Sequence, residues 1–184
     1  MTLFQGKYRM ESARLRDWDY AAPGWYFVTV CTARRKCWFG DIGPSGPHLS
    51  AIGVAAERHW CAIPTHYTNI RLDAFVVMSN HIHGIIIIDG EHPYTPQPKD
   101  LPYRTPGLAP PAAGSLSAIV RSYKAGVTHW CKANGHSNFA WQARFYDRVI
   151  RGNREVGAVR EYIRLNPENW LRDEFHPSMA PPET

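Results

Sequence analysis

The stretch "MSNHIHGIIII", residues 78–88, places two histidines in an otherwise apolar segment, and the fold can be worked out from it. The isoleucines that follow Gly84 are typical of a buried strand. Side chains alternate between the two faces of a strand, so His81 and His83 point the same way with their backbones about 6 to 7 Å apart. Two imidazoles at that spacing can bind one metal ion.

The histidine pair has other interpretations that involve no metal. One imidazole could be exposed while the other bonds a backbone carbonyl. The same His-x-His pattern occurs in amidohydrolase and cupin barrels, but the first needs a longer chain and the predicted helices argue against the second. Gly84 would let another backbone or a ligand approach the strand closely. The pattern by itself leaves metal binding open.

Composition indicates one globular domain. The 184 residues are 44% apolar and 12% aromatic, so we expect a single domain over residues 1–184. No apolar run approaches the roughly 20 residues that cross a bilayer. The N-terminal residues also lack the apolar block of a signal peptide, which predicts a cytoplasmic protein. The four cysteines have no CxxC spacing and are expected to be reduced thiols.

Positive charge is concentrated in the C-terminal half. Residues 115–172 hold ten Lys or Arg against four Asp or Glu, a balance of +6, whereas the whole chain carries +5. Such a field attracts polyanions and speeds encounter with phosphate backbones, although many basic proteins bind no nucleic acid. Charge therefore suggests a nucleic-acid partner without establishing one.

The spacing of apolar residues, together with capping residues and prolines, predicts the order of the helices and strands. We expect strands over residues 25–32, 70–79 and 81–89, and another within 139–150. Ser79 and Asn80 suggest a hairpin between the second and third, although a single kinked strand also fits. Ser50 and Ser115 are candidate N-caps of two helices, the first of which Pro64 ends. Asn153 begins a final helix that ends before Pro167. Residues 90–114 form a proline-rich excursion, and 171–184 a short tail.

The order β, α, β, β, α, β, α is that of an α+β protein with a ferredoxin-like, or split βαβ, arrangement. In it, helices cover one face of an antiparallel four-stranded sheet. The added C-terminal helix must cover another surface. If it lies on the face that carries the histidines, it makes a cleft there.

The chain resembles a known family over roughly residues 8–170. "VVMSNHIHGIIII" is similar to the HUH motif of the single-tyrosine transposases of the IS200/IS605 type. "FAWQARFYDRVIRGNREVGAVREYIRLNPENW" resembles the C-terminal signature of their relatives, the REP-associated tyrosine transposases. "RLRDWDYAAPGWYFVTVCTARRKCWFG" is similar to the N-terminal strand region of the same group. His-x-His is weak evidence alone, but the combination with Tyr-Ile-x-x-Asn-Pro about eighty residues later is specific.

The resemblance implies a metal-dependent endonuclease and strand transferase that acts on single-stranded DNA beside a hairpin, of REP or transposon-end type. His81 and His83 match the motif histidines and Tyr162 the nucleophile, which would form a 5′-phosphotyrosine. Asn166 matches a third metal ligand. Residues 162 and 166 are four apart and so share one helix face, which supports the pairing independently. Mg²⁺ or Mn²⁺ suits an amide oxygen and water, although histidines also accept zinc.

DNA contacts and oligomeric state follow less directly. Basic side chains that could follow a phosphate backbone are Arg34, Arg35, Lys36, Arg121, Lys124, Arg144, Arg148, Arg151 and Arg154, and Trp38, Trp141 or Phe145 could stack on bases. The resemblance allows a monomer or a homodimer that exchanges helices.

Two other tyrosines and two other functions compete with this hypothesis. Tyr123 lies on an apolar helix stripe and Tyr146 in a predicted strand, so both are expected to be packing residues. The chain could instead recognise DNA hairpins without cutting them. It could also be an unrelated metal phosphodiesterase in which water attacks and Tyr162 is structural.

Overall fold

The computed structural model describes residues 3–4, 8–9, 18–90 and 111–179. The main strands are β3 (Gly24–Cys31), β6 (Ile70–Val77), β7 (His81–Ile88) and β8 (Tyr146–Ile150). The helices are α1 (Ala51–Cys61), α2 (Ile63–His66), α3 (Leu116–Ala133) and α4 (Asn153–Leu165). Two short ladders pair β1 (Leu3–Phe4) with β2 (Tyr8–Arg9) and β4 (Gly40–Gly43) with β5 (Gly46–Leu49).

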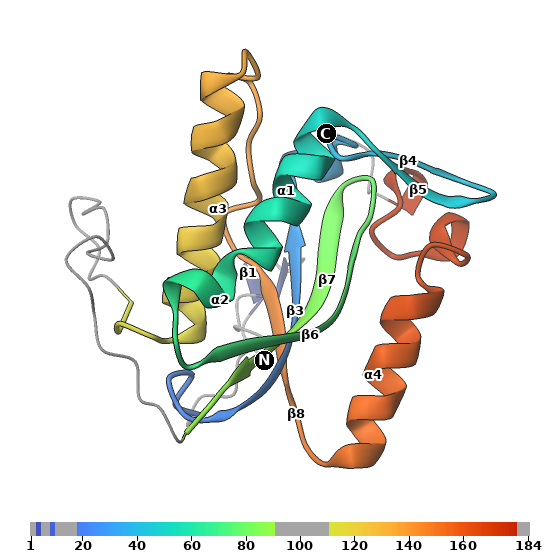
Figure 1. Cartoon of the computed structure of the whole chain (residues 1–184). Coiled ribbons are helices and arrows are strands. Elements are labelled where there is room, and N and C mark those ends of the chain that lie inside the picture. Colours follow the sequence, from blue (N-terminus) through green and yellow to red (C-terminus); the bar gives the residue numbers. More distant parts are fainter. Residues whose placement is uncertain (1–2, 5–7, 10–17, 91–110, 180–184) are drawn as a thin grey trace.

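The main sheet has the order β6-β7-β3-β8, and all of its neighbouring strands are antiparallel. The predicted α+β fold with a four-stranded antiparallel sheet is confirmed. β7 is central, and every one of its residues is buried. Figure 1 shows α1, α2 and α3 on one side of the sheet and α4 on the other. The isoleucine run is continuous because both faces of β7 are covered.

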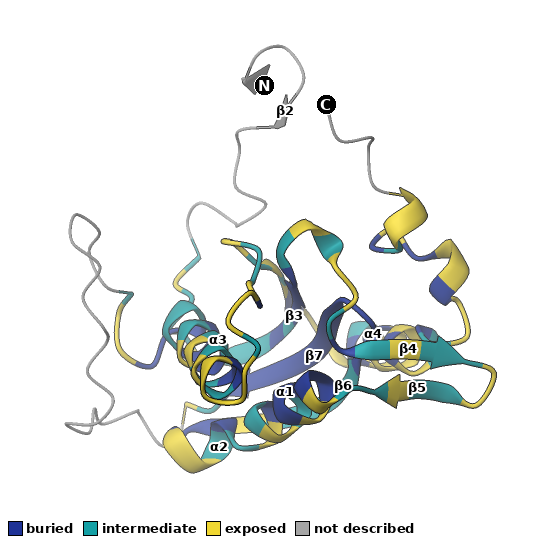
Figure 2. Ribbon diagram, turned by 90° about the horizontal axis from the view of Figure 1, so that it is seen from above, coloured by how far each residue is buried: buried dark blue, intermediate teal, exposed yellow. Residues whose placement is uncertain are grey.

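Alternation along β7 divides the interior into two cores. Ile82, Ile86 and Ile88 join the larger core beneath α1 and α3. Ile85 and Ile87 join a smaller core beneath α4. His81 and His83 have the same parity as these last two, so they lie on the α4 face. Seen from above in Figure 2, β3 and β7 are buried between the helical layers.

The helix starts follow the predicted caps. The Ser50 hydroxyl accepts from the Gly53 amide at 3.1 Å, and the Ser115 hydroxyl accepts from the Ala118 amide at 3.3 Å. Pro64 does not end the first helical region as expected. α1 ends at Cys61, and Pro64 lies in the first turn of α2, where its missing N–H costs no hydrogen bond.

Other boundaries differ from the sequence prediction. The last strand is limited to five residues, because residues 142–145 form no ladder with β3. The β4–β5 hairpin was not predicted, nor were the 3₁₀ turns Ala33–Arg35, Trp170–Arg172 and Pro177–Met179. Residues 91–110 of the proline-rich excursion and 180–184 of the tail lie outside the described residues. Within the described ranges, no helix combines the length and apolarity needed to cross a bilayer.

Gly84 has a packing reason of its own. A Cβ at this position would overlap the indole ring of Trp60, which α1 presses against the strand. The close approach expected at Gly84 is therefore made by a side chain of the core.

We predict that Gly84→Ala lowers the free energy of unfolding by about 1 to 3 kcal/mol, because Trp60 has no room to move in a packed interior. Chemical denaturation measures this. Gly157→Ala is the matched control, since a Cβ there meets open space on an exposed helix and should stabilise by about 0.5 to 1 kcal/mol. Equal destabilisation by both changes would contradict the packing explanation.

Candidate active site

The two histidines of β7 meet beneath α4. In the sheet register His83 stands opposite Thr29, and His81 stands opposite Cys31. Their ring centroids are 4.4 Å apart, and 0% and 1% of the His81 and His83 surfaces are exposed. The strand geometry thus delivers two buried imidazoles to one place.

Each imidazole has a partner at Nδ1. The Thr29 hydroxyl lies 2.8 Å from His83 Nδ1, and Asn80 Oδ1 lies 2.8 Å from His81 Nδ1. Both Nε2 atoms therefore point to the other side of the rings. His81 Nε2 is buried and has no hydrogen-bond partner within the described ranges. His83 Nε2 lies 3.3 Å from the Tyr162 hydroxyl.

α4 carries Tyr162 to the histidines. The Glu155 carboxylate accepts from the Arg151 amide at 2.6 Å, which helps to begin the helix. Val156, Val159 and Ile163 then form its apolar stripe against the sheet. Tyr162 follows at the edge of this stripe, 43% exposed.

Phe27 completes the aromatic contacts of the phenol. Its ring stacks on His83 at 5.3 Å between centroids and meets Tyr162 edge-on at 5.8 Å. The phenol ring also meets His83 edge-on, at 5.2 Å. These contacts hold the hydroxyl at the imidazole while one side of the ring remains open to solvent.

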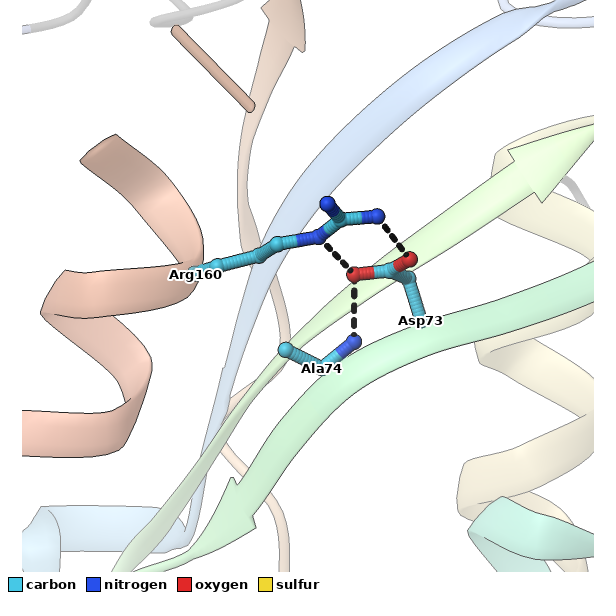
Figure 3. Close-up of polar contacts among 3 residues, drawn as sticks. All are labelled: Asp73, Ala74 and Arg160. Carbon is cyan, nitrogen blue, oxygen red and sulfur yellow. Dashed lines mark hydrogen bonds and ion pairs between the residues drawn. The ribbon is translucent and has the colours of Figure 1, made fainter. Parts of the chain in front are cut away.

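An ion pair fastens α4 to the sheet of the same chain. Arg160 Nε donates to Asp73 Oδ1 at 2.8 Å, and Nη2 donates to Oδ2 at 2.7 Å (Figure 3). Asp73 Oδ1 also accepts from the Ala74 amide, at a point where β6 departs from regular pairing between Leu72 and Phe75. The irregularity turns the carboxylate toward the helix, and the two parallel bonds fix the direction of Arg160.

Asn166 lies one turn beyond Tyr162 and is 3% exposed. Its Nδ2 donates to Asp173 Oδ2 at 2.9 Å, while the Phe175 amide donates to Asp173 Oδ1 at 2.6 Å. Asn166 Oδ1 is buried and has no partner within the described ranges. Asp173 therefore orients the Asn166 amide and leaves its oxygen unpaired.

The donor atoms of this site fit a metal ion. One ligand atom each of His81, His83 and Asp173 lies within 4.8 Å of the others, so this group could hold a cation. Two buried acceptors without partners in the described ranges, His81 Nε2 and Asn166 Oδ1, belong to side chains that lie close together. An unpaired buried acceptor costs about 1 to 3 kcal/mol, and a bound cation would satisfy both.

Residues 170–176, at the start of the tail, cover the histidines, although the sequence analysis assigned them no role at the site. The Phe175 ring lies 4.9 Å from the His81 ring, and the Trp170 ring lies 6.0 Å from it. Arg35 stands over Phe175 at 5.3 Å and donates to the Glu174 carbonyl. No periodicity marks residues 170–176, so nothing in their sequence could have assigned Asp173 to the site.

Burial sets the protonation of the site. It lowers the pKa of His81 to about 3, with the Arg35 charge acting the same way and Asn166 opposing it. The pKa of His83 is well below its ordinary value, first through burial and then through the His81 charge. Both imidazoles are therefore neutral at pH 7 and can act as ligands. Burial, then Asp173 and Glu174, raises the pKa of Tyr162 to about 12, against the effect of Asn166.

Comparisons with known proteins give the family and the fold. No family model matches the chain. An uncharacterized protein of Haemophilus influenzae is 33% identical over 174 residues, which cover 93% of this chain and 95% of the relative. The chain belongs to the family of this Haemophilus protein.

A solved structure, that of a REP-associated tyrosine transposase bound to a REP hairpin, aligns with a TM-score of 0.57. The two sequences are 20% identical, and the alignment covers 87% of this chain and 74% of the transposase chain. The chain has the tyrosine-transposase fold. A candidate transposase from Deinococcus radiodurans aligns over 83% of this chain and 96% of its own, at 13% identity and a TM-score of 0.44.

Within this tyrosine-transposase fold the rival tyrosines lie in different environments. Tyr123 is 3% exposed and donates to the Ala56 carbonyl at 3.2 Å, so it is a packing residue as expected. Tyr146 lies in β8 as expected and is 44% exposed, so only part of its side chain packs. It stands opposite Thr29 in the register and meets Phe175 at 5.6 Å. Of the three, Tyr162 is the one placed at an imidazole nitrogen.

Three of the basic candidates lie in one turn, and one of them, Arg35, contacts Phe175. Arg34 and Arg35 adopt left-handed backbone conformations with φ of 54° and 53°, which is uncommon away from glycine. Arg34 and Lys36 are exposed, and Lys36 stands 4.1 Å from the Trp38 ring centre. The turn therefore presents two cations, Arg34 and Lys36, to solvent, while Arg35 stands over Phe175.

The other basic candidates are dispersed. Arg148 pairs with Glu155 of α4 at 2.5 Å, Arg151 stands 6.0 Å from the Trp18 ring centre, and Arg144 and Arg154 are exposed. Arg121 is half-buried on α3, on the opposite side of the sheet. Lys124 donates to the carbonyls of residues 142, 143 and 144, and burial lowers its pKa to about 8. The stacking candidate Trp141 packs against the main core.

We predict that Asp73→Ala loosens α4, because Arg160 then has no carboxylate on the sheet to bind. Hydrogen exchange of the α4 amides should become faster while that of α3 stays unchanged. Arg164→Ala is the control, since its partner Glu161 lies on the same helix at 2.7 Å. If both changes loosen α4 equally, the pair between helix and sheet does not hold it in place.

Proposed function

We propose that the protein is a metal-dependent endonuclease and strand transferase for single-stranded DNA, with Tyr162 as the nucleophile. The observation that carries the proposal is the Tyr162 hydroxyl at 3.3 Å from His83 Nε2, in a site whose ligand atoms include His81 and Asp173. A phenol held against a group that could bind a cation is the arrangement that attack on a phosphodiester needs.

The reaction is a transesterification. The Tyr162 oxygen bonds to phosphorus, and the bond from phosphorus to the 3′ oxygen breaks. The phenol releases its proton to water, and the departing 3′ oxygen takes one up. The product is a 5′-phosphotyrosine with a free 3′-hydroxyl. A second 3′-hydroxyl can reverse the step and join DNA without ATP, because the phosphoester has been kept.

His81, His83 and Asn166 are the proposed protein ligands of the metal. Their donors would be the two Nε2 atoms and the amide oxygen that Asp173 turns inward. A divalent ion there would supply positive charge against the phosphate oxygens. Two neutral imidazoles and one amide leave that charge undiminished, and Mg²⁺ or Mn²⁺ suits the oxygen ligand and water. Asp173 stands close enough to serve as a further ligand.

Access to the two histidines depends on Phe175, which covers them. His81 and His83 are buried and the Phe175 ring lies against both imidazoles, so a phosphate reaches them only if the Phe175 side chain moves. Asn80 holds the backbone of Phe175 by donating to its carbonyl at 2.8 Å. The nucleophile Tyr162 is itself partly exposed, so a DNA strand can approach α4 before the Phe175 side chain moves.

A DNA hairpin is the proposed partner. The fold is that of a transposase solved with a REP hairpin. Cationic side chains border the site, because Arg35 stands over Phe175 and Arg148 lies opposite Phe27 in the sheet register. The cytoplasm is where such DNA would be met. Because α4 packs on the sheet of its own chain and is fastened there by Arg160, each chain can complete a site alone, which favours action as a monomer.

We predict that Tyr162→Phe abolishes the covalent protein–DNA adduct and leaves hairpin affinity within about threefold, since only the attacking oxygen is lost. Denaturing electrophoresis with a labelled hairpin library measures the adduct, and a gel shift measures binding. Tyr146→Phe is the control, because that phenol shares the sheet face without touching an imidazole nitrogen. Binding by the wild type with no adduct would select the non-cleaving hairpin protein, and turnover by Tyr162→Phe would select water as the attacking group.

Metal removal is expected to stop cleavage. EDTA, or His83→Ala, should reduce adduct formation about 100-fold or more, because the phosphate charge is then uncompensated. Added Mn²⁺ should restore the EDTA-treated wild type and not the variant. His48→Ala is the control, since His48 is exposed on β5. Full activity of the wild type in EDTA would contradict metal dependence.

A further inference from the structure

Each histidine of the candidate site has a buried polar side chain at its Nδ1 nitrogen. Asn80 is 0% exposed and Thr29 is 3% exposed. Their oxygens lie 2.8 Å from Nδ1 of His81 and His83, respectively. These contacts determine which nitrogen of each ring is left for another partner.

The Asn80 amide has only one orientation that satisfies its surroundings. Its Nδ2 donates to the Arg35 carbonyl at 2.9 Å and to the Phe175 carbonyl at 2.8 Å, which uses both of its protons. Oδ1 must then face His81. Because an amide oxygen only accepts, His81 Nδ1 carries the proton and donates it. His81 Nε2 is left with a lone pair, and it is the buried atom without a partner.

Thr29 holds His83 without choosing its tautomer. A hydroxyl can donate or accept, so His83 Nδ1 can be bonded with or without its proton. The tautomer then follows the group that faces Nε2. In this structure that group is the Tyr162 hydroxyl, which can also act in either direction. His83 can therefore pair with the phenol or present a lone pair to a cation, and the ring stays in place.

We propose that Thr29 and Asn80 are positioning residues of the metal site. Asn80 keeps His81 permanently in the ligand tautomer, and Thr29 holds the His83 ring while its tautomer changes. This inference rests on the proposed function, because it concerns ligands of the metal proposed there. Groups that bond the second nitrogen of a ligand histidine typically change metal affinity 10- to 100-fold when removed.

The wild-type protein alone tests the Asn80 part. Long-range ¹H–¹⁵N correlation spectra of the metal-free protein at pH 7 report which nitrogen of each ring is protonated. His81 should be wholly the Nδ1–H form, while His83 shifts toward Nδ1–H when Zn²⁺, a diamagnetic probe, is added. A His81 ring protonated at Nε2 would overturn the role of Asn80.

Substitution tests the Thr29 part. Thr29→Val keeps the shape of the side chain and removes the hydroxyl, so Mn²⁺ affinity measured by calorimetry without DNA should fall at least about tenfold. Thr29→Ser should bind Mn²⁺ within about threefold of the wild type. Thr128→Val is the control, because the Thr128 hydroxyl donates to the Lys124 carbonyl of its own helix, at 2.8 Å. Thermal melting verifies that each variant is folded.

The outcomes separate this inference from the proposed function. If the wild type binds Mn²⁺ and Thr29→Val binds it equally well, Thr29 does not position His83, while the metal site stands. If Thr29→Ser fails to restore affinity in a folded protein, the hydroxyl is not the cause. If the wild type itself binds no Mn²⁺, the proposed metal site fails and this inference fails with it.

Discussion

β7 is buried on both of its faces, and the candidate site depends on that constraint. One face packs under α1 and α3 and the other under α4, so alternate residues of one strand enter two separate cores. The isoleucines satisfy this arrangement by apolar burial alone. The two histidines do not, because each carries two ring nitrogens into an interior with little water. The neighbouring side chains must supply hydrogen-bond partners for those nitrogens.

Hydrogen-bond partners are complete at the Nδ1 side of the two rings and incomplete at the Nε2 side. Nδ1 of each imidazole has a buried oxygen at 2.8 Å, whereas His81 Nε2 has no partner within the described ranges. The Asn166 oxygen is unpaired in the same way. Buried polar groups are rarely left unsatisfied, and a bound ion is one explanation for two such atoms in one site. Asymmetric pairing of this kind is what a preformed binding site requires.

The position of Tyr162 depends on α4 being held by its own sheet. The apolar stripe of the helix supplies most of the attraction, but a stripe permits sliding and rotation. The bidentate pair between Arg160 and Asp73 removes that freedom, because a guanidinium and a carboxylate bond in parallel only in one plane. The irregular pairing of β6 is what turns Asp73 to meet it.

The sequence by itself determined the order of the elements, the caps at Ser50 and Ser115, and the face shared by His81 and His83, because periods of 2 and 3.6 and capping residues act locally. The four-residue spacing of Tyr162 and Asn166 likewise predicted that they share one face of a helix. Only the tertiary structure decided that Asp173 and Phe175 lie on the histidines, that Asn80 bonds the carbonyls of residues 35 and 175, and that Asp73 anchors α4. These contacts join residues far apart in the chain at places without periodicity, so no local pattern encodes them.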